Sequence, residues 1–166
     1  DVIKGTKFEL PVLVAAFYGL RRGKVVGLKW DAIDFERGTI TIKHTVTSVQ
    51  MDGKTKMYAQ DSAKTKSSMR TLPLVGSFAE YFKEVKAAQD VNKKVCGNCY
   101  NYEYDGYVFV DELGNLMNPN YLTRQFPQYI QKHGCKRMRF HDLRHSCASL
   151  LLANGVPLKQ IQEWLG

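Results

Sequence analysis

One stretch of strict apolar and polar alternation constrains the fold of this chain most. From residue 38 to residue 46, apolar residues and His44 alternate with threonines and a lysine. A two-residue period is that of a half-buried β-strand. Asp52-Gly53 then has the composition of a tight turn, and residues 71–74 form a second short apolar run around a proline. The chain is therefore expected to contain a small antiparallel sheet with a basic hairpin.

Elsewhere the apolar residues recur every three or four positions, which is the period of an amphipathic helix. The pattern and the helix-end signals predict helices over 8–20, 22–28, 77–95, 120–133, 140–153 and 158–165, and a short buried strand over 107–110. Ser77 with Glu80 has the spacing of a capping box. The predicted fold class is α+β, a mainly helical domain with a small antiparallel three-stranded β-sheet.

The length and the charge bound the possible functions. The length of 166 residues corresponds to one domain, or to one domain and a fragment. The 24 Lys and Arg against 16 Asp and Glu give a net charge of +8. Such a basic surface often binds nucleic acid, although a basic composition alone does not require that partner. The apolar runs are too short to cross a bilayer, and no secretory signal is present. We therefore expect a cytoplasmic protein with no membrane partner.

The four cysteines do not predict a metal site. Cys96 and Cys99 form a CxxC pair, whereas Cys135 and Cys147 lie singly. A zinc site needs a second pair at matched spacing, and His133 with Cys135 is a poor match. We predict reduced thiols, with neither a metal nor a cofactor.

The densest polar cluster begins the predicted helix 140–153. At about 100° per residue, His141, Arg144 and His145 share one side of this helix. The opposite side would carry Leu143, Cys147 and Leu150. Backbone amides and the helix dipole favour an anion at a first turn, so the polar side predicts a phosphate site, although it would also fit a solvated face.

Two further segments are suited to phosphate. Arg21 and Arg22 lie between two glycines, and a guanidinium can bind two phosphate oxygens at once. Residues 62–70 are rich in lysine and hydroxyl groups, as in loops that contact a nucleic-acid backbone. Each segment alone also fits an ordinary surface turn. Together, arginine, lysine and histidine without an acidic cluster indicate phosphoryl transfer without a metal.

Taken in order, these blocks resemble the catalytic domain of the tyrosine recombinases, or phage-type integrases. The matching blocks are Gly19–Gly23, Leu28–Asp34, Lys64–Ser68, Leu72–Leu74, His141–His145, Asn154–Pro157 and Glu163–Gly166. The resemblance implies that residues 1–166 are the C-terminal catalytic domain, without the arm- and core-binding domains and the extreme C-terminus. It also implies site-specific integration or excision of a prophage, transposon or other mobile genetic element through a 3′-phosphotyrosyl intermediate.

The resemblance also implies site residues. Arg21 and Arg144 would clamp the scissile phosphate. Lys64 would protonate the leaving 5′ oxygen, His141 would assist proton transfer, and His145 would support the site. Further DNA contacts are expected at Lys66, Arg70, Asn120 and Arg124.

Two departures from the family pattern stand out. The acidic residue usually found three positions after the first arginine is replaced by Lys24. The nucleophilic tyrosine is expected beyond residue 166, so the given residues alone should not cleave DNA.

The implied partners are double-stranded DNA and further copies of the parent protein in a tetrameric synapse, in a bacterial or phage-encoded system. A type IB topoisomerase, or a non-catalytic DNA-binding or regulatory domain of the same fold, is the alternative. The Trp30-Asp31 block favours the recombinase over the topoisomerase. The complete set of Arg21, Lys64, His141 and Arg144 argues against a mere binding domain.

Overall fold

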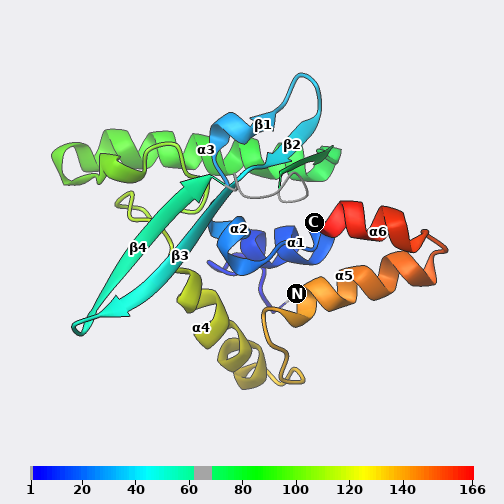
Figure 1. Cartoon of the computed structure of the whole chain (residues 1–166). Coiled ribbons are helices and arrows are strands. Elements are labelled where there is room, and N and C mark those ends of the chain that lie inside the picture. The colour runs from blue at the N-terminus through cyan, green and yellow to red at the C-terminus, as the bar shows by residue number, and fades with distance from the viewer. Residues whose placement is uncertain (1, 62–68) are drawn as a thin grey trace.

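A computed structural model describes residues 2–61 and 69–166 (Figure 1). Its α-helices are α1 (Glu9–Tyr18), α2 (Arg22–Val26), α3 (Gly76–Cys96), α4 (Pro119–Lys132), α5 (Asp142–Ala153) and α6 (Leu158–Leu165). Its strands are β1 (Ile33–Asp34), β2 (Thr39–Ile42), β3 (His44–Met51), β4 (Lys54–Asp61) and β5 (Arg70–Pro73). Short 3-10 turns cover Trp30–Ala32, Gly97–Cys99 and Tyr102–Tyr104. The predicted mainly helical α+β class is confirmed.

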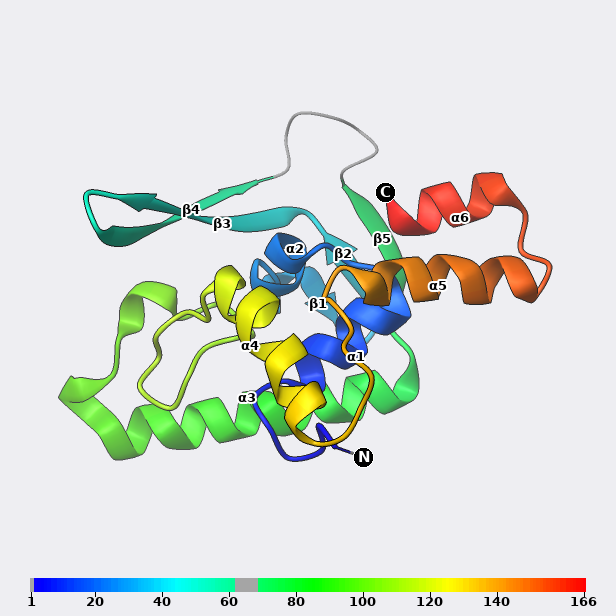
Figure 2. The same ribbon diagram turned by 90° about the horizontal axis from the view of Figure 1, so that it is seen from below.

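Helices α1 and α2 form the centre of the molecule. The long helix α3 lies along one side, and α5 and α6 run antiparallel to each other and extend outward (Figures 1 and 2). The β3–β4 hairpin projects from the body on the side away from α5 and α6 (Figure 2). The C-terminal end of α6 turns back toward the centre of the molecule, close to β5.

The structure has two sheets, of which one has the three strands that were predicted and the other was not predicted. Strands β1, β2 and β5 form the expected three-stranded antiparallel sheet, in which Ile42 lies opposite Arg70. The predicted strand 38–46 is wrong as one continuous element. It is divided at Lys43, after which β3 pairs with β4 in a second, two-stranded sheet. The alternation of burial continues through the division, so the sequence period did not reveal the change of partner.

Three local predictions are corrected. Residues 107–110 make only isolated bridges, because their backbone bonds go to separate loop segments, as in the bond from Val108 N to the Leu28 carbonyl. Helix α3 begins at Gly76, so Ser77 lies inside its first turn and no side chain caps it. Leu150 is 66% exposed rather than buried, because α5 extends away from the core.

The core fixes the turn between α1 and α2 against the sheet. The side chains of Val14, Val25 and Ile40 are fully buried. Each such burial contributes about 1.5–3 kcal/mol. Tyr18 is also fully buried, and its hydroxyl donates to the Pro73 carbonyl at 3.1 Å, which ties α1 to β5. This packing brings the two basic segments at residues 21 and 70 to the same part of the molecule.

Candidate functional site

The turn between α1 and α2 places Arg21. Gly19 ends α1 with a left-handed φ of 62°, a conformation that glycine adopts without strain. A Cβ at this position would collide with Leu165 of α6. Gly19 therefore allows both the tight turn and the close approach of α6, and Arg21 follows at the N-cap of α2.

Arg144 of α5 reaches the same turn. Its Nη1 donates to the carbonyls of Gly19 and Leu165, each at 2.7 Å, and its Nη2 donates to the Gly166 carbonyl at 3.0 Å. Arg21 Nη1 donates to the same Gly166 carbonyl at 3.5 Å. Burial, and then the charge of Arg21, lower the pKa of Arg144. The structure thus brings together the two arginines that the sequence analysis singled out.

Two further cations lie next to these arginines. Lys24 of α2 is only 7% exposed, and burial followed by the charges of Arg70, Arg21 and Arg144 lowers its pKa to about 8. Burial and the charges of Arg144 and Arg21 lower the pKa of Arg70 to about 10. We refer to Arg21, Lys24, Arg70 and Arg144 as the cation cluster.

Arg70 has an unusual environment within this cluster. It begins β5, and its Nε, Nη1 and Nη2 atoms are buried without a hydrogen-bond partner. No ion pair in the described ranges 2–61 and 69–166 includes Arg21, Arg70 or Arg144. A buried charge without a partner is costly, so the cluster as it stands favours an anion.

The two histidines lie at the beginning of α5. His141 is exposed and precedes the helix, which begins at Asp142 rather than at residue 140 as predicted. The His141 and His145 rings meet edge to face, with centroids 4.9 Å apart. Burial, and then electrostatic interactions with His145 and Arg144, lower the pKa of His141. The lowered pKa favours the neutral imidazole, which can accept a proton.

Asp142 organises the turn that carries these histidines. Its carboxylate accepts from the Arg139 backbone N–H at 2.9 Å and from Arg139 Nη2 at 2.8 Å. These bonds lower the pKa of Asp142 to about 2. A carboxylate that is charged and bonded in this way fits the first turn of a helix.

Two predicted DNA contacts, Asn120 and Arg124, lie outside this group. Lys64 and Lys66 lie outside the described residues. Asn120 and Arg124 are on α4, whose N-terminus is capped by the Asn118 side chain accepting from Asn120 N at 2.8 Å. Helix α4 contacts α2 through Arg22, but it contributes no residue to the cation cluster within the described part of the chain.

The sequence analysis missed a second polar group, which we call the His44 network. His44 is 8% exposed, and its two ring nitrogens bond to Asp61 Oδ1 at 2.6 Å and to the Tyr107 hydroxyl at 2.9 Å. The bond with His44 lowers the pKa of Asp61, and burial raises that of Tyr107. Lys29 lies over the Tyr107 ring at 5.0 Å. The available signal was a histidine on the apolar face of a strand.

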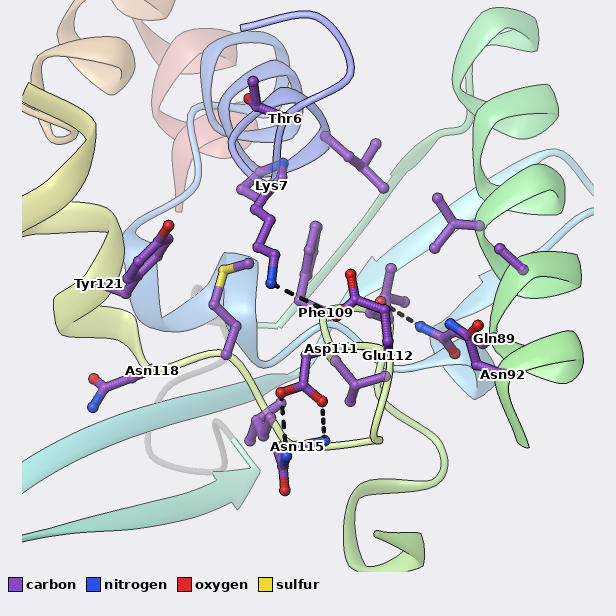
Figure 3. A pocket seen from close by; sticks show the side chains of 18 of the residues that line it. Thr6, Lys7, Gln89, Asn92, Phe109, Asp111, Glu112, Asn115, Asn118 and Tyr121 are labelled. Atoms are coloured by element: carbon purple, nitrogen blue, oxygen red, sulfur yellow. Dashed lines mark hydrogen bonds and ion pairs between the residues drawn. The ribbon is translucent and has the colours of Figure 1, made fainter. Parts of the chain in front are cut away.

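A cavity of about 440 Å³ lies between α1, α3 and residues 108–118 (Figure 3). Lys7 and Glu112 pair across it at 3.6 Å, and Asp111 accepts from the backbone and side-chain N–H groups of Asn115. Gln89 donates to the Val108 carbonyl at 2.7 Å. The polar groups at this cavity are therefore largely paired, unlike Arg70.

All four cysteines are free thiols, and Cys147 is buried with its thiol donating to the Phe17 carbonyl. In ranges 2–61 and 69–166, no three His, Cys, Asp or Glu residues are placed to hold a metal ion. None of the helices in those ranges is long and apolar enough to cross a membrane.

Related sequences match nearly the whole chain. The model of the phage integrase family matches residues 7–166. A XerC-like tyrosine recombinase of Caldanaerobacter subterraneus subsp. tengcongensis is 34% identical over 171 residues, covering 100% of this chain and 44% of that protein. The ICEBs1 integrase of Bacillus subtilis is 26% identical over 159 residues, covering 96% of this chain and 41% of that protein. The chain thus spans less than half the length of these relatives.

Solved structures share the fold. The Tn1549 transposon integrase, in complex with circular intermediate DNA, matches with a TM-score of 0.77 and 20% identity, over 98% of this chain and 52% of that chain. The XerA recombinase matches with a TM-score of 0.70 and 20% identity, over 99% of this chain and 51% of that chain.

Proposed function

The chain belongs to the phage integrase family, and on this premise we propose that it is the catalytic domain of a site-specific DNA recombinase. One observation carries the proposal. Arg21 and Arg144, from distant parts of the sequence, meet in a cluster of cations that has no ion-paired carboxylate on its arginines in the described residues. Such a site favours a phosphodiester group, whose charge increases in the transition state of phosphoryl transfer.

Arg144 is oriented to bind a ligand. An arginine has five N–H groups, and the carbonyls of Gly19, Leu165 and Gly166 accept from three of those of Arg144. Two N–H groups therefore remain for the non-bridging oxygens of the scissile phosphate. Arg21 supplies the second guanidinium from the neighbouring turn.

The proposed reaction has two steps, strand cleavage and strand rejoining. A tyrosine C-terminal to residue 166 attacks the phosphorus, its hydroxyl proton passes to neutral His141, and a 3′-phosphotyrosyl bond forms while the 5′ oxygen leaves. Lys64, which lies outside the described residues, donates a proton to that 5′ oxygen. The 5′ hydroxyl of a second strand then attacks the phosphotyrosine, its proton passes to Lys64, and the released tyrosine takes back the proton held by His141. His145 supports His141 through the edge-to-face ring contact.

The proposed partners are double-stranded DNA and further copies of the parent protein, acting as a tetramer in the cytoplasm where bacterial DNA lies. The structure of the related Tn1549 integrase with DNA supports the first partner. Lys66, Asn120 and Arg124 are proposed to contact the duplex beyond the scissile phosphate. The mobile element and its target sequence would be identified from the DNA that flanks the gene.

The decisive experiment measures a covalent protein–DNA adduct with the full-length parent protein. A nicked duplex from the ends of the element traps the adduct, since the cleaved 5′ fragment diffuses away. Arg144→Ala should reduce the rate of adduct formation by at least 1,000-fold, which corresponds to about 4 kcal/mol of transition-state stabilisation. Its circular dichroism spectrum should stay unchanged. Arg37→Ala, in the exposed turn between β1 and β2, is the matched control and should react normally.

Three results would contradict the proposal. If an Arg144→Ala protein still formed the adduct at the normal rate, Arg144 would not have the assigned role. A wild-type protein that binds DNA without forming an adduct supports the non-catalytic alternative. Relaxation of supercoiled DNA without strand exchange supports the topoisomerase alternative.

A further inference from the structure

Arg70 is the least compensated group among the described residues. All three of its guanidinium nitrogens are buried without a hydrogen-bond partner, and the charges nearest to it include Arg144 and Arg21. By contrast, the carbonyls around Arg144 accept three bonds from that residue. A buried guanidinium without acceptors loses its hydration and gains nothing in exchange. Something outside the described contacts must compensate Arg70.

Lys24 is a further buried cation beside these arginines. It is 7% exposed and lies within electrostatic range of all three arginines of the cluster. Helix α2 holds it there, because a Cβ at the neighbouring Gly23 would lie 2.6 Å from the Val46 carbonyl, so α2 packs directly on β3. The integrase family usually has an acidic residue at this position, and a carboxylate there would carry the opposite charge beside Arg70. The cation cluster of this chain therefore has two more positive charges than that pattern.

We propose that Lys24 and Arg70 form the inner layer of the phosphate site, so that the charge compensating Arg70 is a phosphate oxyanion instead of a protein carboxylate. The oxyanion is either a DNA phosphodiester or free inorganic phosphate, which offer the same oxygens. Lys24 and Arg70 act as positioning residues beneath Arg21 and Arg144. That the oxyanion comes from DNA rests on the proposed function, whereas the oxyanion site itself does not.

The packing supports this assignment. Arg70 comes from β5, Lys24 from α2, Arg21 from the preceding turn and Arg144 from α5, so four separate segments direct a cation to one place. β5 is held to α1 by the bond from the Tyr18 hydroxyl to the Pro73 carbonyl. A set of like charges fixed by rigid elements is preorganised for an anion and opposes folding until one binds.

Anion binding at this site should also take up protons. A bound oxyanion favours the charged form of Lys24 and raises its pKa above the value of about 8 in the ligand-free protein. Between these two values, the complex holds a proton on Lys24 that the ligand-free protein lacks. Affinity for phosphate should therefore fall as pH rises above 8, and the fall should be absent without Lys24.

The test uses Lys24→Glu and Arg70→Gln in the full-length protein. The first places a carboxylate beside Arg70, and the second removes the buried charge. Lys94→Glu, on the exposed face of α3, and Arg37→Gln are the matched controls. Thermal unfolding is followed while inorganic phosphate or a short duplex is added, at an ionic strength held constant with potassium chloride.

Lys24→Glu is expected to stabilise the ligand-free protein but to weaken its binding of ligand. Lys24→Glu should raise Tm without ligand, because Arg70 gains a partner, and should weaken the apparent affinity for phosphate and for the duplex by at least tenfold. Arg70→Gln should weaken both affinities without lowering Tm. Stabilisation of the wild type by inorganic phosphate would show that the site takes the free anion, and stabilisation by the duplex alone would identify DNA as the source.

Two results would overturn the inference. One is a Lys24→Glu protein that unfolds at a lower Tm than the wild type or does not fold, since that shows Lys24 to be needed for the fold itself. The other is an affinity within twofold of the wild type for both ligands in either variant. Adduct formation by the wild type is measured separately. A protein that forms the adduct but fails these tests contradicts only this inference, whereas phosphate binding without an adduct contradicts only the proposed function.

Discussion

Two groups of polar side chains flank residues 62–68, and they differ in how their charges are compensated. Asp61 ends β4 immediately before this segment and belongs to the His44 network. Arg70 begins β5 shortly after it and belongs to the cation cluster. Both nitrogens of the His44 ring have partners, whereas the three nitrogens of Arg70 have none in the described residues.

The difference separates a structural role from a ligand-binding role. A buried polar network whose members satisfy one another stabilises one conformation and has no need of a ligand. A buried cation without acceptors leaves the protein less stable until an anion arrives. The His44 network therefore ties β3 to β4 and to Tyr107, whereas the cation cluster is proposed to bind phosphate. The following predictions test this contrast.

The largest effect on stability is expected for the His44 network. His44→Ala should lower the free energy of unfolding by about 3 kcal/mol, because it opens a cavity and leaves the buried Tyr107 hydroxyl without its hydrogen-bond partner. Urea denaturation measures the change. His133→Ala, at an exposed position beyond α4, should change stability by less than about 0.5 kcal/mol. A loss for His44→Ala no larger than for this control would contradict a structural role.

A smaller loss is expected when one bond of the same network is removed. Tyr107→Phe deletes the hydroxyl and leaves His44 Nε2 without a partner, so unfolding should become easier by about 1 kcal/mol. The same denaturation experiment applies, with Tyr102→Phe on the surface as the control. If Tyr107→Phe raised stability, the hydroxyl of Tyr107 would be the strained group in the network.

An effect confined to alkaline pH is expected in the cation cluster. Lys24 has a pKa lowered to about 8 in the folded chain, against 10.5 unfolded, so between these values the unfolded chain binds more protons. Stability should therefore rise relative to a Lys24→Met variant as pH increases from 8 to 10, and the difference should be constant below pH 8. Thermal unfolding of both proteins across this range gives the comparison. If the stability of both proteins changed with pH in parallel, the pKa of Lys24 would not be lowered in the folded chain.

Much of the candidate site could be predicted from the sequence, because its key residues lie in local patterns. Arg21 lies between glycines that form a turn, and Arg144 lies on the polar side of an amphipathic helix. Both patterns act over a few residues, where dihedral preferences and helical geometry decide the outcome. The structure brings these two arginines together at the end of α6 as expected. The inward direction of Arg70 could not be predicted, because a lysine-rich segment beside it resembles a solvated loop.

The fold shows the same division between local and long-range information. The alternation in residues 38–46 predicted strand and burial, and Ile40, Ile42 and Val46 are buried as it requires. It contained no information about which strand pairs with which, so the change of partner at Lys43 was missed. Leu150 follows the helical period of α5 but is exposed, because α5 extends outward from the body of the molecule (Figure 2).

The sequence by itself determined the α+β class, the family, and the two arginines and histidine of the proposed phosphate site. These follow from short-range periods and motifs, which need only a few neighbouring residues. The tertiary structure decided that Lys24 and Arg70 lie buried beside Arg21 and Arg144, and that His44 is closed between Asp61 and Tyr107. The physical reason is that burial and charge compensation depend on groups from distant segments, which only packing brings within bonding distance.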